Sequence, residues 1–262
     1  MYSRAIRTHQ KINAVAYRHL GELVGLVPSL SLKDIIRFDG KRGPDAPRLY
    51  KTDKGAPWHY YDPAGNSVAF LEILQDHYAS LVYRLQTDNQ ESAAFEAAWL
   101  AHALVDGLTP PHHFPIEAEL EDLHDAPVHA RQTIRSHLMV KGANRRTSLY
   151  KSLRLSGPRG LLTAHTLFEA NAGLIVMTLK LDRAKPSQND LYELEQESFI
   201  EIFERYAREI DQFHMYRRFY KSGWTPKLTR DIRRELAPRM VRLVTLAWYS
   251  ALIDAGLAGV ET

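Results

Sequence analysis

The chain contains no cysteine among its 262 residues, and this absence removes several kinds of chemistry. Disulfide frameworks, cysteine-based zinc fingers and thiol nucleophiles are all excluded. No run of 18 apolar residues occurs either, so we expect no transmembrane segment. Arg4 and Arg7 near the start have no apolar stretch behind them. The sequence therefore predicts no signal peptide, and we expect a cytoplasmic protein unless the chain is a processed form.

Alternating strand patterns are also missing, whereas apolar residues recur with helical spacing along most of the chain. The first predicted helix has Thr8 as its N-cap and extends to Val24. Further helices are predicted over about 31–38, 67–86, 91–107, 158–182, 189–221 and 226–256. Glycine, proline and aspartate between residues 39 and 66 predict an ordered loop. We therefore expect one all-α domain, a multi-helix bundle spanning residues 1–262.

One region, residues 114–164, does not fit this pattern and is predicted to be a helical or loop insertion. Its first part is acidic, and the stretch from Arg131 to Arg159 holds eight Lys and Arg residues but no acid. The interpretation we favour is a hairpin whose two halves neutralise each other. The alternative is a basic lid over an anionic substrate, in which Arg145 and Arg146 overhang the site.

Histidine is the abundant residue, with 12 in the chain, about twice the number expected for this length. His102 and Asp106 stand four residues apart on a predicted helix, and His165 and Glu169 repeat this spacing on another. Side chains at that spacing share one helical face and can converge on one ion. Each pair alone is more often a surface ion pair. However, a turn directly after Asp106 ends the predicted helix, and this turn places His112 beside the first pair.

Three more residues precede these pairs. His59 lies in an aromatic loop, Trp58-His-Tyr-Tyr-Asp-Pro63, Asp45 lies 14 residues before it, and His9 lies in the first predicted helix. This ordered set resembles the zinc-dependent phospholipase C and single-strand-specific nuclease superfamily over roughly residues 8–173. Those proteins carry His-x3-Asp-x5-His, then a later His-x3-Asp/Glu, with a loop histidine and a first-helix histidine before them.

The resemblance implies a cluster of up to three zinc ions. The first would be held by Asp45, His59, His102 and Asp106. The second would be held by His9 and by Asp106, which bridges the two sites. The third would be held by His112, His165 and Glu169. His and carboxylate ligands with open positions suit catalytic zinc.

The implied activity is hydrolysis of a phosphodiester, either a phospholipid head-group ester or a nucleic acid. A metal-bound hydroxide would attack phosphorus, and the third zinc would neutralise charge on an oxygen. Asp45 is the candidate catalytic residue that steers or deprotonates the water. The aromatic loop leans toward the phospholipase branch, and a nuclease would offer aromatic platforms for stacking. Candidate platforms are Trp58, Tyr60, Tyr61 and Phe114.

An alternative function is a non-catalytic helical scaffold with an incomplete metal cluster. Mature members of the superfamily begin with tryptophan, which completes the second zinc site, whereas this chain begins Met1-Tyr2-Ser3. Zinc analysis separates the two functions. His113 is adjacent to His112 and is an alternative ligand in its place. The other histidines are expected to be surface or hydrogen-bonded residues: His19, His77, His124, His129, His137 and His214.

Overall fold

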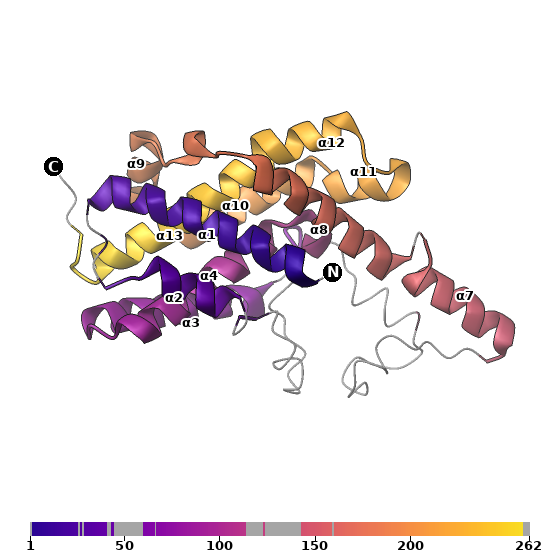
Figure 1. Cartoon of the computed structure of the whole chain (residues 1–262), viewed down its shortest axis with the longest axis horizontal. Helices are drawn as coiled ribbons and strands as arrows, with labels where there is room; N and C mark the ends of the chain where they lie inside the picture. The colour runs from indigo at the N-terminus through magenta and orange to yellow at the C-terminus, as the bar shows by residue number, and fades with distance from the viewer. Residues whose placement is uncertain are drawn as a thin grey trace.

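The structure is a computed structural model, and its regular elements are all helical. It describes residues 2–25, 27, 29–40, 43–44, 60–65, 67–113, 123, 143–158 and 160–258, with the side chains of the first helix described from Thr8 onward. No strand occurs in these ranges, which confirms the all-α prediction. Most helices lie side by side along the long axis of the molecule (Figure 1).

The first helix, α1 (Tyr2–Val24), begins well before the residue predicted to cap it. Thr8 therefore lies inside the helix, because the residues before it include no helix breaker. The inner face of α1 carries Ile12, Ala16 and Leu20, which are spaced four apart and fully buried. The predicted amphipathic pattern is thus confirmed, and only the start of the helix was wrong.

Two further helices lie against α1 and against each other. Helix α2 (Leu32–Asp39) corresponds to the helix predicted over about 31–38, and its N-cap is Ser31, whose side chain accepts a hydrogen bond from the backbone N–H of Asp34. Helix α4 (Gln90–Leu108) is buried along most of its length and packs on α2. Its early turns bury alanines, which let neighbouring helices approach closely.

Helix α3 (Val68–Gln86) pairs with α4 and covers its outer side (Figure 1). The last turn of α4 contains Gly107, where a Cβ atom would lie 2.7 Å from Phe203 and 2.8 Å from Phe70. Only glycine allows the helix to press against these two rings. The 3-10 turn Pro110–His113 follows, because two consecutive prolines cannot continue the α-helix.

The stretch predicted as one helix over 189–221 is three shorter helices. They are α9 (Gln188–Gln196), α10 (Phe199–Gln212) and α11 (Met215–Ser222). A capping box at Ser198 starts α10, and His214 adopts a left-handed conformation with φ of 48° between α10 and α11. These local signals override the apolar periodicity that continues across the breaks.

The last predicted helix, 226–256, is continuous but not uniform. Helix α12 (Pro226–Asp231) passes through a π-helical turn (Ile232–Leu236) into α13 (Ala237–Asp254). Trp248 in α13 is fully buried and donates a hydrogen bond from its indole N–H to the carbonyl oxygen of Ala97, at 3.0 Å. This contact joins the C-terminal helix to the centre of α4.

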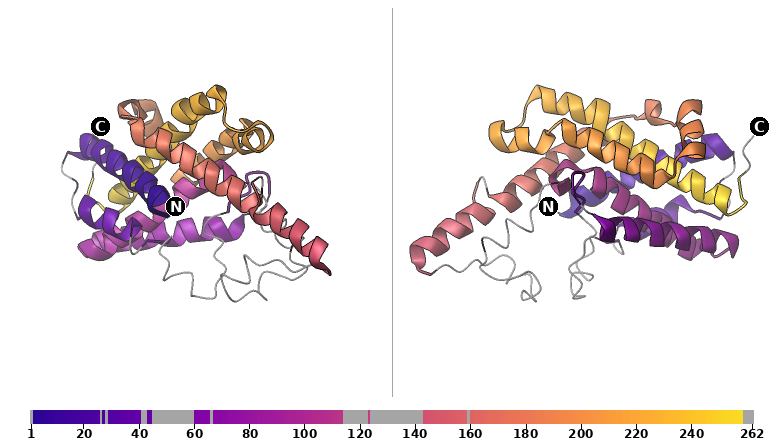
Figure 2. Two further views of the ribbon diagram at one scale, coloured as in Figure 1. Left: turned by 45° about the vertical axis from the view of Figure 1, so that its right-hand side comes forward. Right: turned by 180° about the vertical axis from the view of Figure 1, so that it is seen from behind.

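Helix α8 (Leu161–Thr178) lies in the bundle, and α7 (Arg145–Ser156) extends beyond it (Figures 1 and 2). Gly173 of α8 is so close to α1 that a Cβ atom there would lie 2.5 Å from the hydroxyl oxygen of Thr8. Most of the predicted insertion, 114–122 and 124–142, lies outside the described residues.

By length and composition, one helical stretch of the described residues, Arg145–Thr178, is apolar enough to cross a membrane. Of its most apolar window of 18 residues, 39% is buried inside the protein. Phe168 and Val176 of α8 belong to the core. A core helix passes the same test, so the stretch is weak support for a membrane span.

Candidate metal centre

Seven ionisable side chains converge from four helices and one turn. His9 comes from α1, Asp39 from the last position of α2, and His102 and Asp106 from α4. His112 lies in the 3-10 turn, and His165 and Glu169 lie on α8. The close approach of α1 and α8, together with the abrupt end of α4, brings these elements to one place.

The first group consists of His9, Asp39 and His102. Each offers one nitrogen or oxygen atom, and these atoms lie within 4.8 Å of one another. Nδ1 of His102 is 3.2 Å from Oδ1 of Asp39, and the rings of His9 and His102 are stacked with centroids 4.2 Å apart. All three side chains are buried, and Asp39 is only 1% exposed.

The second group consists of His112, His165 and Glu169, again with donor atoms within 4.8 Å of one another. Oε1 of Glu169 is 2.9 Å from Nε2 of His112 and 3.0 Å from Nε2 of His165. The two imidazole rings are stacked with centroids 4.9 Å apart. The predicted convergence of His165 and Glu169 on one helical face is confirmed by this geometry.

Asp106 lies between the two groups. Its Oδ1 is 3.2 Å from Nε2 of His9, and its Oδ2 is 3.3 Å from Nε2 of His102. The same Oδ2 is 3.9 Å from Nδ1 of His112, which belongs to the second group. One carboxylate thus faces imidazoles of both groups, which is the arrangement that a bridging ligand requires.

Burial and charge together shift the titration of two of these side chains. Burial alone would raise the pKa of Glu169, but hydrogen bonds from His112 and His165 outweigh it and hold that pKa well below its ordinary range. Burial and the nearby His102 lower the pKa of His9, but the hydrogen bond and charge of Asp106 raise it more. The net pKa of His9 is therefore above its ordinary value.

Buried polar atoms without a partner and the chemistry of the side chains are both compatible with a bound metal ion. Nδ1 of His9, Oδ2 of Asp39 and Nδ1 of His165 are buried and have no hydrogen-bond partner within the described part of the chain. Buried polar atoms are normally hydrogen-bonded, and those that are not are explained in some structures by an ion or a water. Imidazole nitrogens with carboxylate oxygens form a ligand set that suits zinc. The two groups could each hold a metal ion.

Of the predicted ligands, Asp45 and His59 lie outside the described residues. The structure instead brings Asp39 into the first group, and sequence reasoning missed it. No local signal singled it out, because Asp39 is one of four aspartates in the segment 39–66, which the sequence predicts to be a loop. The resemblance implies a different carboxylate, Asp45, which lies 14 residues before His59.

His113 was a possible substitute for His112, and the structure separates their roles. Nε2 of His113 is 2.8 Å from the carbonyl oxygen of Gly107, and its ring lies against Tyr61. Burial lowers the pKa of His113 to about 4, so the imidazole is neutral. His112 faces Glu169, whereas His113 holds the turn in place.

The remaining described histidines have the hydrogen-bonded or surface roles expected of them. Nε2 of His19 is 3.0 Å from the carbonyl oxygen of Leu181. Nδ1 of His77 is 2.6 Å from Oε2 of Glu96. His124, His129 and His137 lie outside the described residues.

Comparisons of the chain with protein-family models, with curated proteins and with solved structures gave no match. The buried side-chain groups are therefore the basis of the proposed function.

Proposed function

We propose that the protein is a zinc-dependent phosphoric ester hydrolase that cleaves a phosphodiester. The observation that carries the proposal is the pair of buried histidine and carboxylate groups with Asp106 between them. The resemblance of the ordered ligand set to the zinc-dependent phospholipase C and nuclease superfamily supports the same activity. The proposal includes two zinc ions at the two groups and a third ion that would also use His59.

The strongest physical support for bound metal is the concentration of carboxylates inside the protein. Asp39, Asp106 and Glu169 all lie in this cluster, and the first two are almost completely buried. Buried carboxylates are costly unless they are paired or coordinate a metal ion. Divalent cations would neutralise all three and would take up the imidazole nitrogens beside them.

When bound at such a site, zinc lowers the pKa of a water molecule and polarises a phosphoryl oxygen. The chain's own residues would set the geometry of that chemistry. Asp39 would fix the ring of His102 through Nδ1. His112, His165 and Glu169, whose facing atoms lie about 3 Å apart, would together hold the second ion. Asp45 remains the predicted residue for steering or deprotonating the attacking water.

The two candidate substrates are a phospholipid head-group ester and single-stranded nucleic acid. Among the described aromatic residues, Tyr60 stands beside the second group, with its ring centroid 5.6 Å from that of His112. Tyr61 was a candidate stacking platform, but it is 3% exposed and packs between Phe70 and Phe203. Tyr61 is therefore a core residue, and Tyr60 is the better candidate for contact with substrate.

The decisive experiment measures zinc and hydrolysis on the same purified protein. We expect two or three zinc ions per chain by mass spectrometry, and hydrolysis of bis(p-nitrophenyl) phosphate that a chelator removes and added zinc restores. His165→Ala should lose zinc and reduce hydrolysis by about 100-fold or more. Loss of a residue that only supports a metal ligand lowers activity by about 10- to 100-fold, and loss of the ligand itself should lower it further.

A matched control is His77→Ala, which removes another histidine paired with a glutamate, Glu96, in the same bundle. This variant should keep the zinc and the activity of the unmodified protein. A folded protein with no zinc and no hydrolysis after zinc is added would refute the proposal and leave the helical scaffold. Hydrolysis by His165→Ala at the unmodified rate would also refute it.

A further inference from the structure

Helix α7 combines positive charge with apolar side chains and extends away from the bundle. Its sequence, Arg145–Ser156, contains Arg145, Arg146, Lys151 and Arg154 and no acidic residue. Figure 2 shows it extending past the other helices in both views. An exposed helix of this composition is an unusual feature on a bundle whose other long helices bury one face.

The apolar side chains of α7 fall on two opposite sides. Leu155 is fully buried in a small cluster with Leu123 and Leu161, and it attaches the helix to the start of α8. Leu149, Tyr150 and Leu153 are 63%, 62% and 53% exposed. At 100° per residue, these three span an arc of about 100° on the side away from Leu155.

The arginines border this exposed apolar stripe. Arg146 precedes Tyr150 by one helical turn, and Arg154 follows it by one turn. Arg145 stands one turn before Leu149 in the same way. Aliphatic side chains flanked by cations, with a tyrosine among them, are typical of helices that lie in a membrane interface.

We propose that α7 is a docking helix for a lipid surface that carries negative charge. Leu149 and Leu153 would enter the boundary between head groups and acyl chains, and the arginines would meet anionic head groups. A nucleic acid would satisfy the same charges but would leave the two leucines exposed to water. The apolar stripe therefore favours the lipid surface, and the charge favours an anionic one.

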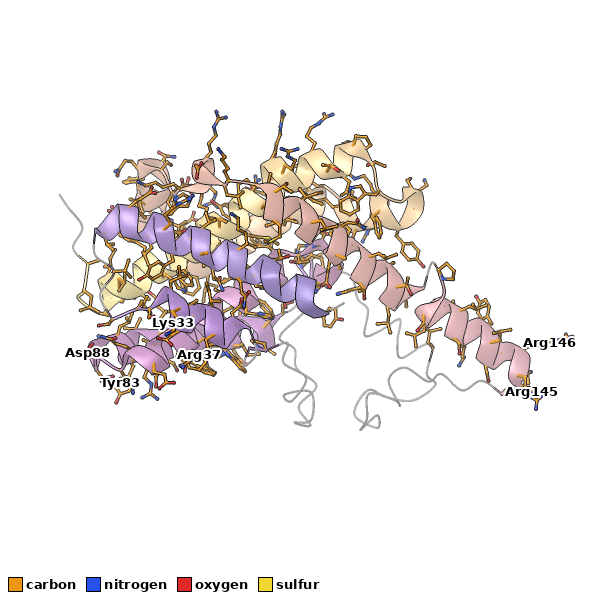
Figure 3. The ribbon with its side chains drawn as sticks, in the orientation of Figure 1. Lys33, Arg37, Tyr83, Asp88, Arg145 and Arg146 are labelled. Carbon is orange, nitrogen blue, oxygen red and sulfur yellow. The ribbon has the colours of Figure 1, made fainter. Side chains whose placement is uncertain are left out.

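This arrangement also bears on the alternative interpretation in which Arg145 and Arg146 overhang the metal site. Figure 3 shows Arg145 and Arg146 at the end of α7 farthest from the bundle. Twenty residues of mostly helical chain separate Arg145 from His165, which corresponds to about 30 Å along a helix. The docking function is independent of the metal centre, because it uses none of the metal-binding side chains.

The test is binding of the full chain to vesicles in the presence of a chelator, so that the result does not depend on zinc. We expect cosedimentation with phosphatidylcholine vesicles that contain phosphatidylserine and weaker binding to phosphatidylcholine alone. Arg145→Ala/Arg146→Ala should weaken binding to the anionic vesicles by about 10- to 30-fold at low salt. The difference should narrow as salt rises, since salt screens exposed charges.

The leucine variant tests the apolar half of the surface. Leu149→Ser/Leu153→Ser should weaken vesicle binding at both low and high salt, because burial of apolar area is not screened. The matched control is Arg233→Ala/Arg234→Ala, which removes two exposed adjacent arginines from the bundle surface. It lowers the net charge equally and should keep nearly all of the binding.

Three outcomes would overturn the proposal. The first is no binding of the unmodified chain to anionic vesicles. The second is equal loss of binding in the control and the α7 arginine variant, which would reflect net charge alone. The third is binding to a single-stranded oligonucleotide, or self-association, that depends on α7 while vesicle binding does not.

Discussion

The metal centre and helix α7 depart from the usual distribution of side chains in opposite ways. The centre buries ionisable groups, with His102, Asp39 and Asp106 each 5% exposed or less. Helix α7 exposes large apolar groups, with Leu149 and Tyr150 more than half accessible. Buried charge and exposed apolar surface are the two observations about burial that carry functional information.

The two regions also differ in the kind of partner that would neutralise the buried charge or cover the exposed apolar surface. Carboxylates and imidazoles held within a few ångströms of one another require a compact positive charge at a defined position. An exposed stripe bordered by arginines requires an extended surface, and its position matters less than its area and charge. A single substitution should therefore change metal binding strongly in the centre, and it should change lipid binding only weakly in α7.

The largest expected effect is at Asp106, which faces both groups. Asp106→Asn should lose more zinc and more activity than Glu169→Gln, because Glu169 contacts only the second group. We expect a fall in hydrolysis of about 100-fold or more for Asp106→Asn. Zinc content per chain and the rate of hydrolysis, measured on the same purified variants, test this prediction. Equal zinc in both variants and the unmodified protein would exclude the bridge.

The next effect distinguishes two carboxylates. Asp39→Asn should lower zinc content by one ion per chain, because Asp39 lies within reach of a metal held by His9 and His102. Asp45→Asn tests the carboxylate that the resemblance implies, and it should slow hydrolysis if Asp45 steers the water. Zinc retained in Asp39→Asn and lost in Asp45→Asn would assign the first site to Asp45 instead.

A half-buried tyrosine whose hydroxyl is hydrogen-bonded within the protein gives the reference for the metal centre. The hydroxyl of Tyr78 donates to Oδ2 of Asp254 at 2.6 Å and lies 2.7 Å from Oγ of Ser250. Tyr78→Phe should cost about 1 kcal/mol of unfolding free energy, equally with and without zinc. Denaturant unfolding with and without zinc measures this loss of unfolding free energy. A loss that differs between the two conditions would contradict the expected difference between Tyr78 and the metal centre.

The same tyrosine predicts a dependence on alkaline pH. Burial, with the hydrogen bond and charge of Asp254, raises the pKa of Tyr78 above its ordinary value. The folded protein keeps this proton when the unfolded chain loses it, so stability is fully present below about pH 10 and falls as pH rises further. Tyr78→Phe should lose less stability above that pH than the unmodified protein.

The smallest expected effect is on the stability of α7. Leu149→Ser/Leu153→Ser should change unfolding free energy by less than about 0.5 kcal/mol, as exposed side chains usually do. It should also leave amide hydrogen exchange in α7 unchanged. Leu155→Ala, in the same helix but buried, should accelerate that exchange. Equal exchange in both variants would mean that the exposed leucines also hold the helix in place.

Much of the helical content and part of the site follow from the sequence, because both depend on local geometry. The period of 3.6 residues predicts helices from apolar spacing, and it places His102 beside Asp106 and His165 beside Glu169. The two prolines after Thr109 likewise end α4 wherever the rest of the chain lies. These relations hold within a few residues of the chain, so the sequence by itself determined them.

Other features were decided only by tertiary structure, because they join residues that are far apart in the chain. Asp39 meets His102 across 63 positions, and no local pattern indicates which of the four aspartates in the predicted loop 39–66 will do so. Tyr61 turns into the core because Phe70 and Phe203 meet it there. Arg145 lies away from the bundle because α7 extends beyond it (Figure 3). Local spacing set the side chains that share a helical face, whereas helix packing decided which faces meet around the metal centre.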